Sequence, residues 1–405
     1  MIKEKYQITQ VETSFNVASS RLESIRKKNI TKTGYRVYQD GLIGVYGQLG
    51  QNEEDPWEKA LENLIKNRVD YPYEPARKIR REKVVPANLD DNRIMHELEA
   101  VLAKARTDHP DFIFSNKVNV TQVSVVLEND LDTYLAFTDK VLDVGLILKH
   151  KESIQIMDAF VAYQSRHWDP DYFLWELNRM TEAFNNPIAF PDEELPIVAG
   201  AGLLVGKLIE ELNGEKVGYQ SSLFAKNLGE KVFHDDFTFY LDWDESEQYH
   251  VPFFDAEGTI IEEGRVDLIK NGVIEKPYTD KRTADRFNFP LTGSAVCSYD
   301  GVPTLGARNF NIDRSSKTLK ELLPGGQGIV VAIASGGDYT DEGKFATPVQ
   351  LGFLTDGVQL LGRLPEFHIS GHLYDLFGKD YIGFSKDRFL FGEHALVVRM
   401  NCSKT

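Results

Sequence analysis

The chain has 405 residues and a formal net charge of -16. Phosphate binding requires a basic surface that releases counterions, so this acidic balance argues against a nucleic-acid partner. Hydrophobic residues make up 42% of the chain and charged residues 27%, which is ordinary for a globular protein and excludes the disordered and fibrous classes.

Two cysteines are too few for a disulfide framework, and the separation of Cys297 and Cys402 matches no common metal-binding spacing. This usage is typical of a reducing compartment. The first ten residues lack the apolar core of a signal peptide, and no window approaches the ~18 apolar residues that a membrane-spanning helix requires. We therefore expect a cytoplasmic protein with no membrane partner.

A β-hairpin is predicted for residues 34–50, because Asp40 and Gly41 form a turn signal between two runs of β-forming residues. A helix is expected to follow, with Asp55 as its cap and Pro56 at its first position. Its apolar residues recur at helical spacing, at Trp57, Ala60, Leu61, Leu64 and Ile65. These signals together predict a hairpin followed by an amphipathic helix.

The charged, proline-containing segment 71–86 is interpreted as a linker. Its basic run, residues 77–83, is interpreted as solvated or ion-paired rather than as a binding surface. A second amphipathic helix is predicted from about residue 91 to residue 105, with an apolar stripe formed by Ile94, Leu98, Val101, Leu102 and Ala105. We therefore place a domain boundary at residue 86.

Residues 118–163 contain three runs of strand-forming residues with polar breaks between them, which predicts an antiparallel meander. A third helix is expected to follow, with Asp169 as its cap and Pro170 at its first position. Its buried residues are predicted to be Phe173, Leu174, Leu177, Met180 and Phe184. The next segment, 185–196, is rich in proline, asparagine and acidic residues and forms a second boundary.

Helices are predicted for residues 202–212 and 221–229. Beyond them the chain is dominated by short strands and by turns in which glycine follows Asn, Asp or Glu. The expected fold class is α+β, with an N-terminal α/β half that combines an antiparallel meander with amphipathic helices, and a C-terminal, mostly β half of short strands. Three units are predicted: 1–86, 87–190 and 191–405.

Metal-dependent peptide hydrolysis requires two or three side chains on one cation, a bound water and a carboxylate that accepts its proton. His96 and Glu97 begin such a motif, but no second imidazole follows at residue 100 or 101. His368 and His372 lie four residues apart with Glu366 beside them, which makes these three a weaker metal set. A glycine and the extended run before it favour a strand-to-helix turn there. Neither cysteine lies in a nucleophile signature, so no catalytic residue is assigned.

The order of short motifs in the C-terminal half is more specific. The motifs are, in chain order, Asp280, Thr283 and Ala284; Thr292-Gly293-Ser294-Ala295; Arg308-Asn309-Phe310-Asn311; and Leu319-Lys320-Glu321-Leu322. With them the chain resembles the TldD/PmbA family. In that family a zinc-binding HExxxH helix lies just before the segment that stands here as residues 222–224, and a cysteine ligand lies near the C-terminus. Residues 202–212 contain no histidine and residues 381–387 no cysteine. The chain is therefore most similar to the TldE/PmbA branch, which lacks the zinc motif.

The resemblance implies a non-catalytic subunit of a cytoplasmic metallopeptidase complex that binds extended or unfolded peptides by strand addition. No cofactor is expected in this chain, because zinc would belong to a catalytic, TldD-like partner. A self-dimer is the other expected assembly. Thr292, Gly293 and Asn309 are the candidate residues of the peptide groove.

Three alternatives remain open at this point. The first is a homodimeric binding or regulatory protein without peptidase activity, in line with the family's older label as a modulator of DNA gyrase. The second is a zinc peptidase with unconventional ligands, namely Glu366, His368 and His372. The third is a zinc-free protein that has acquired a different small-molecule site.

Overall fold

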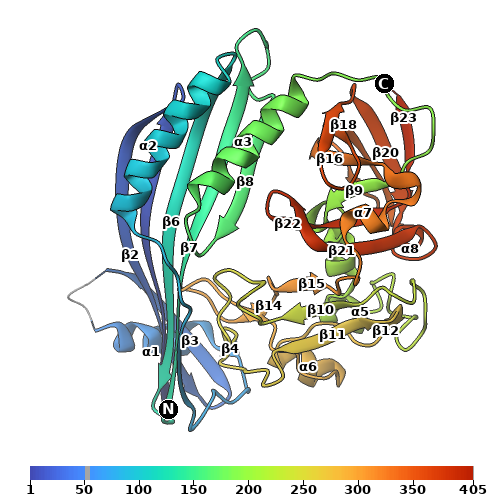
Figure 1. The fold of residues 1–405 in the computed structure, drawn as a ribbon. Helices are drawn as coiled ribbons and strands as arrows, with labels where there is room; N and C mark the ends of the chain where they lie inside the picture. Colours follow the sequence, from blue (N-terminus) through green and yellow to red (C-terminus); the bar gives the residue numbers. More distant parts are fainter. Residues whose placement is uncertain (51–54, 405) are drawn as a thin grey trace.

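The computed structural model describes residues 1–50 and 55–404. Most of the N-terminal half belongs to one eight-stranded sheet with the strand order β4-β3-β2-β1-β6-β7-β5, and β8 pairs with β7. Its strands are β1 (Ile2–Ala18), β2 (Arg21–Gln39), β3 (Leu42–Leu49), β4 (Val69–Asp70), β5 (Arg80–Val84), β6 (Phe112–Asn129), β7 (Thr133–His150) and β8 (Ala159–Ser165). Figure 1 shows the long strands side by side, with the C-terminal half against them.

The predicted hairpin and meander are confirmed. Strands β2 and β3 join through Asp40 (φ 53°) and Gly41 (φ 76°), the two left-handed residues that a tight hairpin turn requires. Strands β6, β7 and β8 pair antiparallel in succession. Strand β1 and most of β2 were not predicted, because runs of polar residues, such as 3–5 in β1 and 26–29 in β2, interrupt their apolar alternation.

Three helices of the N-terminal half begin where the sequence predicts them, two from cap signals and the one at residue 91 from its apolar stripe. They are α1 (Pro56–Asn67), α2 (Asp91–Asp108) and α3 (Pro170–Phe184). Their caps are Asp55, Asp90 and Asp169, whose carboxylates accept N–H groups of the first turn. Helices α2 and α3 lie side by side on one face of the sheet (Figure 1), and their apolar stripes fill the space between helices and strands.

The interpretation of residues 71–86 as a linker is wrong for β5, which pairs parallel with β7 at the edge of the sheet. Four of its five residues are charged and four are exposed, so the strand shows no apolar alternation in the sequence. The ion-paired interpretation of the basic run is confirmed. Arg80 contacts Asp132 at 2.9 Å, and Lys83 pairs with Glu245.

The C-terminal half is built on a nine-stranded sheet with the order β21-β22-β9-β16-β18-β20-β23, to which β17 and β19 add through β18. Its strands are β9 (Ile197–Gly200), β16 (Gly328–Ala334), β17 (Asp338–Tyr339), β18 (Lys344–Thr355), β19 (Leu360–Arg363), β20 (Phe367–His372), β21 (Tyr381–Leu390), β22 (Glu393–Val398) and β23 (Asn401–Lys404). A four-stranded sheet contains β10 (Phe239–Asp242), β11 (Arg265–Lys270), β12 (Val273–Ile274) and β15 (Phe310–Ile312), and β13 (Ala295–Val296) pairs with β14 (Thr304–Leu305).

Short helices connect these strands. They are η1 (Ala201–Leu203), α4 (Gly206–Glu211), α5 (Gly214–Gly218), α6 (Lys281–Phe287), α7 (Leu319–Leu322), η2 (Pro324–Gly326) and α8 (Leu373–Leu376). The helix predicted at 202–212 is present as η1 and α4. The helix predicted at 221–229 is wrong, because this segment forms turns in which Ala225 N–H donates to Ser222 O and Asn227 N–H to Phe224 O. The fold class, α+β with a mostly β C-terminal half, is as predicted.

One hydrophobic core extends across both halves. Phe173 and Met180 of α3 belong to the same buried cluster as Phe353 of β18 and Val397 of β22. The eight-stranded sheet also joins residues on both sides of position 86, since β1 pairs with β6. The division into units 1–86, 87–190 and 191–405 stays a prediction. Among the helices that the structure describes, none is long and apolar enough to cross a membrane.

Replacing Gly44 with alanine is expected to lower the free energy of unfolding by about 1–3 kcal/mol, because α1 lies directly on β3 at this residue. A Cβ atom there would stand 2.2 Å from Ala60 O and 2.5 Å from Leu64 Cβ. Gly145→Ala in β7 is the matched control, since its nearest contact would be Lys117 O at 3.9 Å. Urea unfolding would show a lower midpoint for Gly44→Ala alone, and equal midpoints for the two variants would contradict this packing.

Candidate functional site

The resemblance places helix α4 where the family carries its zinc-binding helix, and α4 and α5 together hold a cluster of four charges. Lys207 is 5% exposed and Glu211 is 1% exposed. Lys207 Nζ lies 2.9 Å from Glu210 Oε2 and 2.9 Å from Glu211 Oε1. Lys216 of α5 approaches the same carboxylates at 2.6 and 3.0 Å. Two ammonium groups therefore neutralise two carboxylates within the chain itself.

Glu211 is held from several sides. Leu223 N–H donates to its second carboxylate oxygen at 2.6 Å, and Ser222 Oγ donates to its backbone carbonyl at 2.6 Å. Burial alone would raise the pKa of the Glu211 carboxyl, but the hydrogen bonds from Lys207, Leu223 N–H and Lys216 outweigh burial and lower it. The carboxylate thus stays ionised, and its negative charge is already compensated.

These residues do not fit a catalytic zinc. Such a site takes three protein ligands, most often imidazoles, thiolates or free carboxylates, and leaves one position for water. Helix α4 offers neither imidazole nor thiolate, and a dication at its carboxylates would meet the ammonium groups of Lys207 and Lys216. Across residues 1–50 and 55–404, no group of three or more His, Cys, Asp and Glu side chains is arranged to hold a metal ion.

The weaker metal set lies around β20. His368 is exposed on this strand, opposite Pro348 on one side and Ser403 on the other. His372 ends the strand and caps α8 by accepting Tyr374 N–H at 3.4 Å. The segment is the strand-to-helix turn that the sequence favoured. Positions four apart on a strand are separated by roughly 13 Å, so the structure does not bring the two imidazoles together. Glu366 directly precedes the strand.

The three candidate groove residues lie in different surroundings. The Thr292 side chain is fully buried, where its hydroxyl accepts Thr279 N–H at 2.7 Å. Asn309 is also buried, and its Nδ2 donates to Asp242 O at 3.0 Å. Gly293 has a left-handed φ of 67° and faces Ile261. Their part in peptide binding stays a prediction.

A buried pair of acids occupies the segment that carries the family resemblance. Asp255 accepts the N–H groups of Glu257, Thr259 and Ala295 at 2.8–3.1 Å. Glu257 accepts the Tyr71 hydroxyl and Lys281 N–H. Burial raises the pKa of Asp255 to about 6, and burial together with the neighbouring charge of Asp255 raises the pKa of Glu257 to about 7. Because Tyr71 belongs to the N-terminal half, the pair links the two halves.

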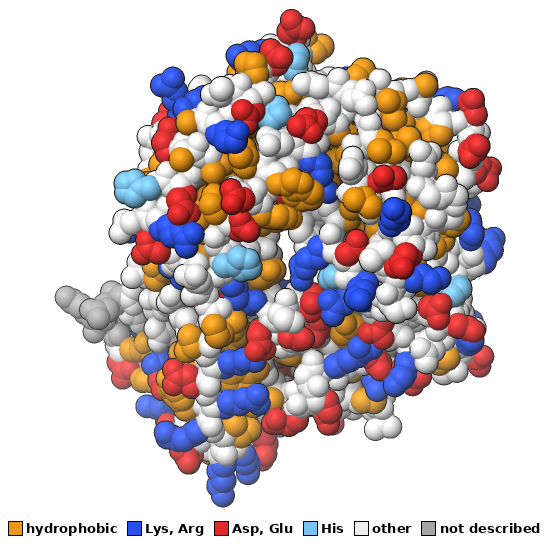
Figure 2. Space-filling model, viewed as in Figure 1, with side chains coloured by type: hydrophobic (Ala, Val, Ile, Leu, Met, Phe, Trp, Pro, Cys, Tyr) orange, Lys and Arg blue, Asp and Glu red, His pale blue; other side chains and the backbone are white. Residues whose placement is uncertain are grey.

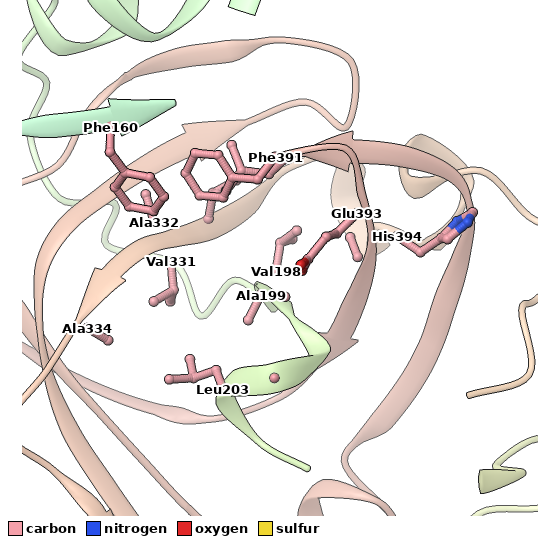
Figure 3. A pocket seen from close by; sticks show the side chains of 15 residues that line it. Phe160, Val198, Ala199, Leu203, Val331, Ala332, Ala334, Phe391, Glu393 and His394 are labelled. Atoms are coloured by element: carbon pink, nitrogen blue, oxygen red, sulfur yellow. The ribbon is translucent and has the colours of Figure 1, made fainter. Parts of the chain in front are cut away.

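The sequence analysis missed a pocket of about 270 Å³ between the two halves. Its residues come from β9, η1, β16 and β22, the β21–β22 turn and, through Phe160, from β8. Figure 3 shows Glu393 pointing into the pocket and His394 pointing away from it. On the face in Figure 2 the surface is hollowed between the halves, with hydrophobic side chains beside the hollow. Four segments that lie far apart in the sequence form this site, so no local motif predicts it.

Comparison with known proteins gives a consistent result. Residues 197–399 match the family model described as the PmbA/TldA metallopeptidase C-terminal domain. TldE from Thermococcus kodakarensis aligns with 100% of this chain and 96% of its own, with a TM-score of 0.80 and 18% identity. A candidate modulator of a DNA gyrase from Thermotoga maritima MSB8 aligns with 99% and 96%, with a TM-score of 0.78 and 16% identity.

A protein of Methanocaldococcus jannaschii, itself uncharacterised, is 20% identical over 327 residues, which are 78% of this chain and 75% of its own. At these identities the solved structures establish the shared fold, and the match to the family model establishes the family. The C-terminal half is thus that of a metallopeptidase-related protein. The chain belongs to the TldD/PmbA family.

Proposed function

We propose that this chain is the non-catalytic subunit of a cytoplasmic metallopeptidase complex, in which it binds extended or unfolded peptides and a TldD-like partner carries the zinc. The charge cluster of α4 is the observation that carries this proposal. Lys207 and Lys216 satisfy Glu210 and Glu211, so the helix that would bring a water to zinc is committed to ion pairs within the chain.

Peptide binding by strand addition is the second part of the proposal. The C-terminal half contains many short strands, several of which are partnered over only part of their length. An extended peptide that pairs with such a strand gains main-chain hydrogen bonds that do not depend on its sequence, and side-chain pockets then select among peptides. A subunit that presents unfolded segments to a partner needs this kind of recognition.

Co-expression with an HExxxH relative from the same genome tests the assembly. We expect the two chains to co-purify, with stoichiometric zinc in the complex and none in this chain alone. Peptide hydrolysis is expected from the complex only, and a complex whose partner has lost the first histidine of its motif serves as the control.

Two results would contradict the proposal. Stoichiometric zinc with peptide hydrolysis in the isolated chain would make it an active peptidase. A closed self-dimer that never recovers the relative would instead favour the regulatory homodimer. A regulatory role is what the name of the Thermotoga maritima protein, a modulator of a DNA gyrase, suggests for that protein.

A further inference from the structure

In the nine-stranded sheet, β9 pairs with only the first part of β16. Strand β9 lies between β16, to which it is parallel, and β22, to which it is antiparallel. Its pairing with β16 ends at Val198, opposite Val330, and the chain turns into η1 at Ala201. Strand β16 nevertheless continues to Ala334. The last residues of β16 therefore border the pocket of Figure 3, at the position that a longer β9 would have filled.

The pocket contains one carboxylate without a partner. Glu393 makes no side-chain hydrogen bond or ion pair with any residue that the structure describes. Arg388, whose charge acts on the Glu393 carboxyl, is engaged by Glu247 at 3.1 Å and by Gly392 O at 2.7 Å. Glu393 is exposed in the chain itself, and the desolvation of its carboxyl by the neighbouring apolar residues raises its pKa. A carboxylate beside apolar walls is complementary to a ligand that combines a positively charged group with an apolar group.

A glycine leaves the space that this carboxylate occupies. A Cβ atom at Gly200, the last residue of β9, would stand 2.8 Å from Glu393 Oε2. The backbone of Gly200 has ordinary angles, φ -62° and ψ 141°, so its lack of a side chain matters for space and not for conformation. The end of β9 and the carboxylate thus form one wall of the pocket.

The remaining walls are apolar. They are formed by Val198, Ala199, Leu203, Val331, Ala332 and Leu390, with Phe160 and Phe391 above them. The two aromatic rings are stacked with their centroids 4.2 Å apart. A volume of about 270 Å³ lies just below the usual range for drug-sized ligands, which suits one or two amino-acid residues.

We propose that this pocket binds the free amino terminus of an extended peptide whose first side chain is apolar. The ammonium group pairs with Glu393, and the first side chain lies beneath Phe160 and Phe391. The peptide backbone then continues along β16 in the direction of β9. This inference rests on the proposed peptide-binding function and deepens it, because it names the end of the peptide that is recognised and the side chain that is preferred.

Isothermal titration of the purified chain with the tripeptide amide Leu-Val-Leu, free or N-acetylated, tests the pocket. We expect the free peptide to bind at least tenfold more tightly than the acetylated one, because the charge-assisted hydrogen bond to Glu393 is lost on acetylation. Glu393→Gln is expected to remove that preference, and Gly200→Ala, whose Cβ atom would displace the carboxylate, is expected to reduce it. Glu82→Gln, the same charge change on the exposed edge strand β5, is the control and is expected to keep it.

Equal binding of the two peptides, or an unchanged preference in Glu393→Gln, would overturn the inference, as would no binding of either peptide. Circular dichroism of each variant establishes that a lost preference is not lost folding. The proposed function is judged separately by capture of the zinc-bearing relative. If that complex forms and hydrolyses peptides whether or not their amino termini are blocked, the function stands and the pocket proposal fails.

Discussion

Replacing Arg36 with methionine is expected to lower the free energy of unfolding by about 3–5 kcal/mol, because the change leaves the carboxylate of Glu4 buried without its countercharge. Arg36 and Glu4 are each only 1% exposed. Their contact, Nη1 to Oε1, is 3.0 Å. The remaining donors to Glu4, the Tyr38 hydroxyl and Asn129 Nδ2, carry no full charge.

Arg36 also joins the two halves of the molecule. Its guanidinium donates to Ala256 O at 2.7 Å and to Cys297 Sγ at 2.8 Å, both in the C-terminal half. Its position over the Tyr6 ring, 4.8 Å from the centroid, fixes it further. The variant therefore loses an attachment between the halves as well as an ion pair.

Urea unfolding monitored by circular dichroism measures this effect. The double variant Glu4→Gln with Arg36→Met removes both charges, and we expect it to be less destabilised than the sum of its two single changes. If the free energy of unfolding of Arg36→Met lies within about 1 kcal/mol of that of the unmodified protein, the buried ion pair does not stabilise the fold as proposed.

The variant Glu257→Gln is expected to gain stability, relative to the unmodified protein, as the pH rises from 5 to 8. The folded-state pKa of Glu257, about 7, lies above its ordinary value of 4.5. Between these values the folded state binds more protons than the unfolded state, so the stability contributed by the carboxyl is present at low pH and is lost as pH rises through 7. At about 1.4 kcal/mol per pKa unit, the loss is on the order of 3 kcal/mol.

Glutamine keeps the hydrogen bonds of the site without taking a charge. Its carbonyl oxygen can accept Lys281 N–H, and its amide can donate to the Tyr71 hydroxyl, the two groups that contact Glu257. As the pH rises from 5 to 8, the unfolding free energy of Glu257→Gln should therefore approach, and then exceed, that of the unmodified protein. Glu82→Gln should follow the unmodified protein throughout. Parallel curves for Glu257→Gln and the unmodified protein would refute the assignment.

Much of the fold follows from local signals. Asp55 and Asp169, each followed by proline, mark helix starts because their carboxylates satisfy free N–H groups of the first turn. Asp40 and Gly41 mark a hairpin because both adopt a left-handed backbone. The sequence also shows that α4 contains no histidine, and the order of its C-terminal motifs predicts the family.

Other features depend on pairing between distant residues. Strand β5 carries charges on both faces and reads as a linker until β7 is placed beside it. The turns at 221–229 replace a helix because Ser222 and Leu223 bond to Glu211, eleven and twelve residues earlier. Thr292 and Asn309 stand in recognisable motifs, yet both are buried. The pocket around Glu393 depends on how β9 ends between two strands that lie far away in the chain.

The two lysines of α4 and α5 have a consequence for how the chain folds. A helix whose carboxylates were balanced by a metal would depend on the supply of that ion during folding. Here the compensating cations are built into the polypeptide, at Lys207 and Lys216, and arrive with translation. This region of the chain can therefore reach its folded state without a supply of metal ions.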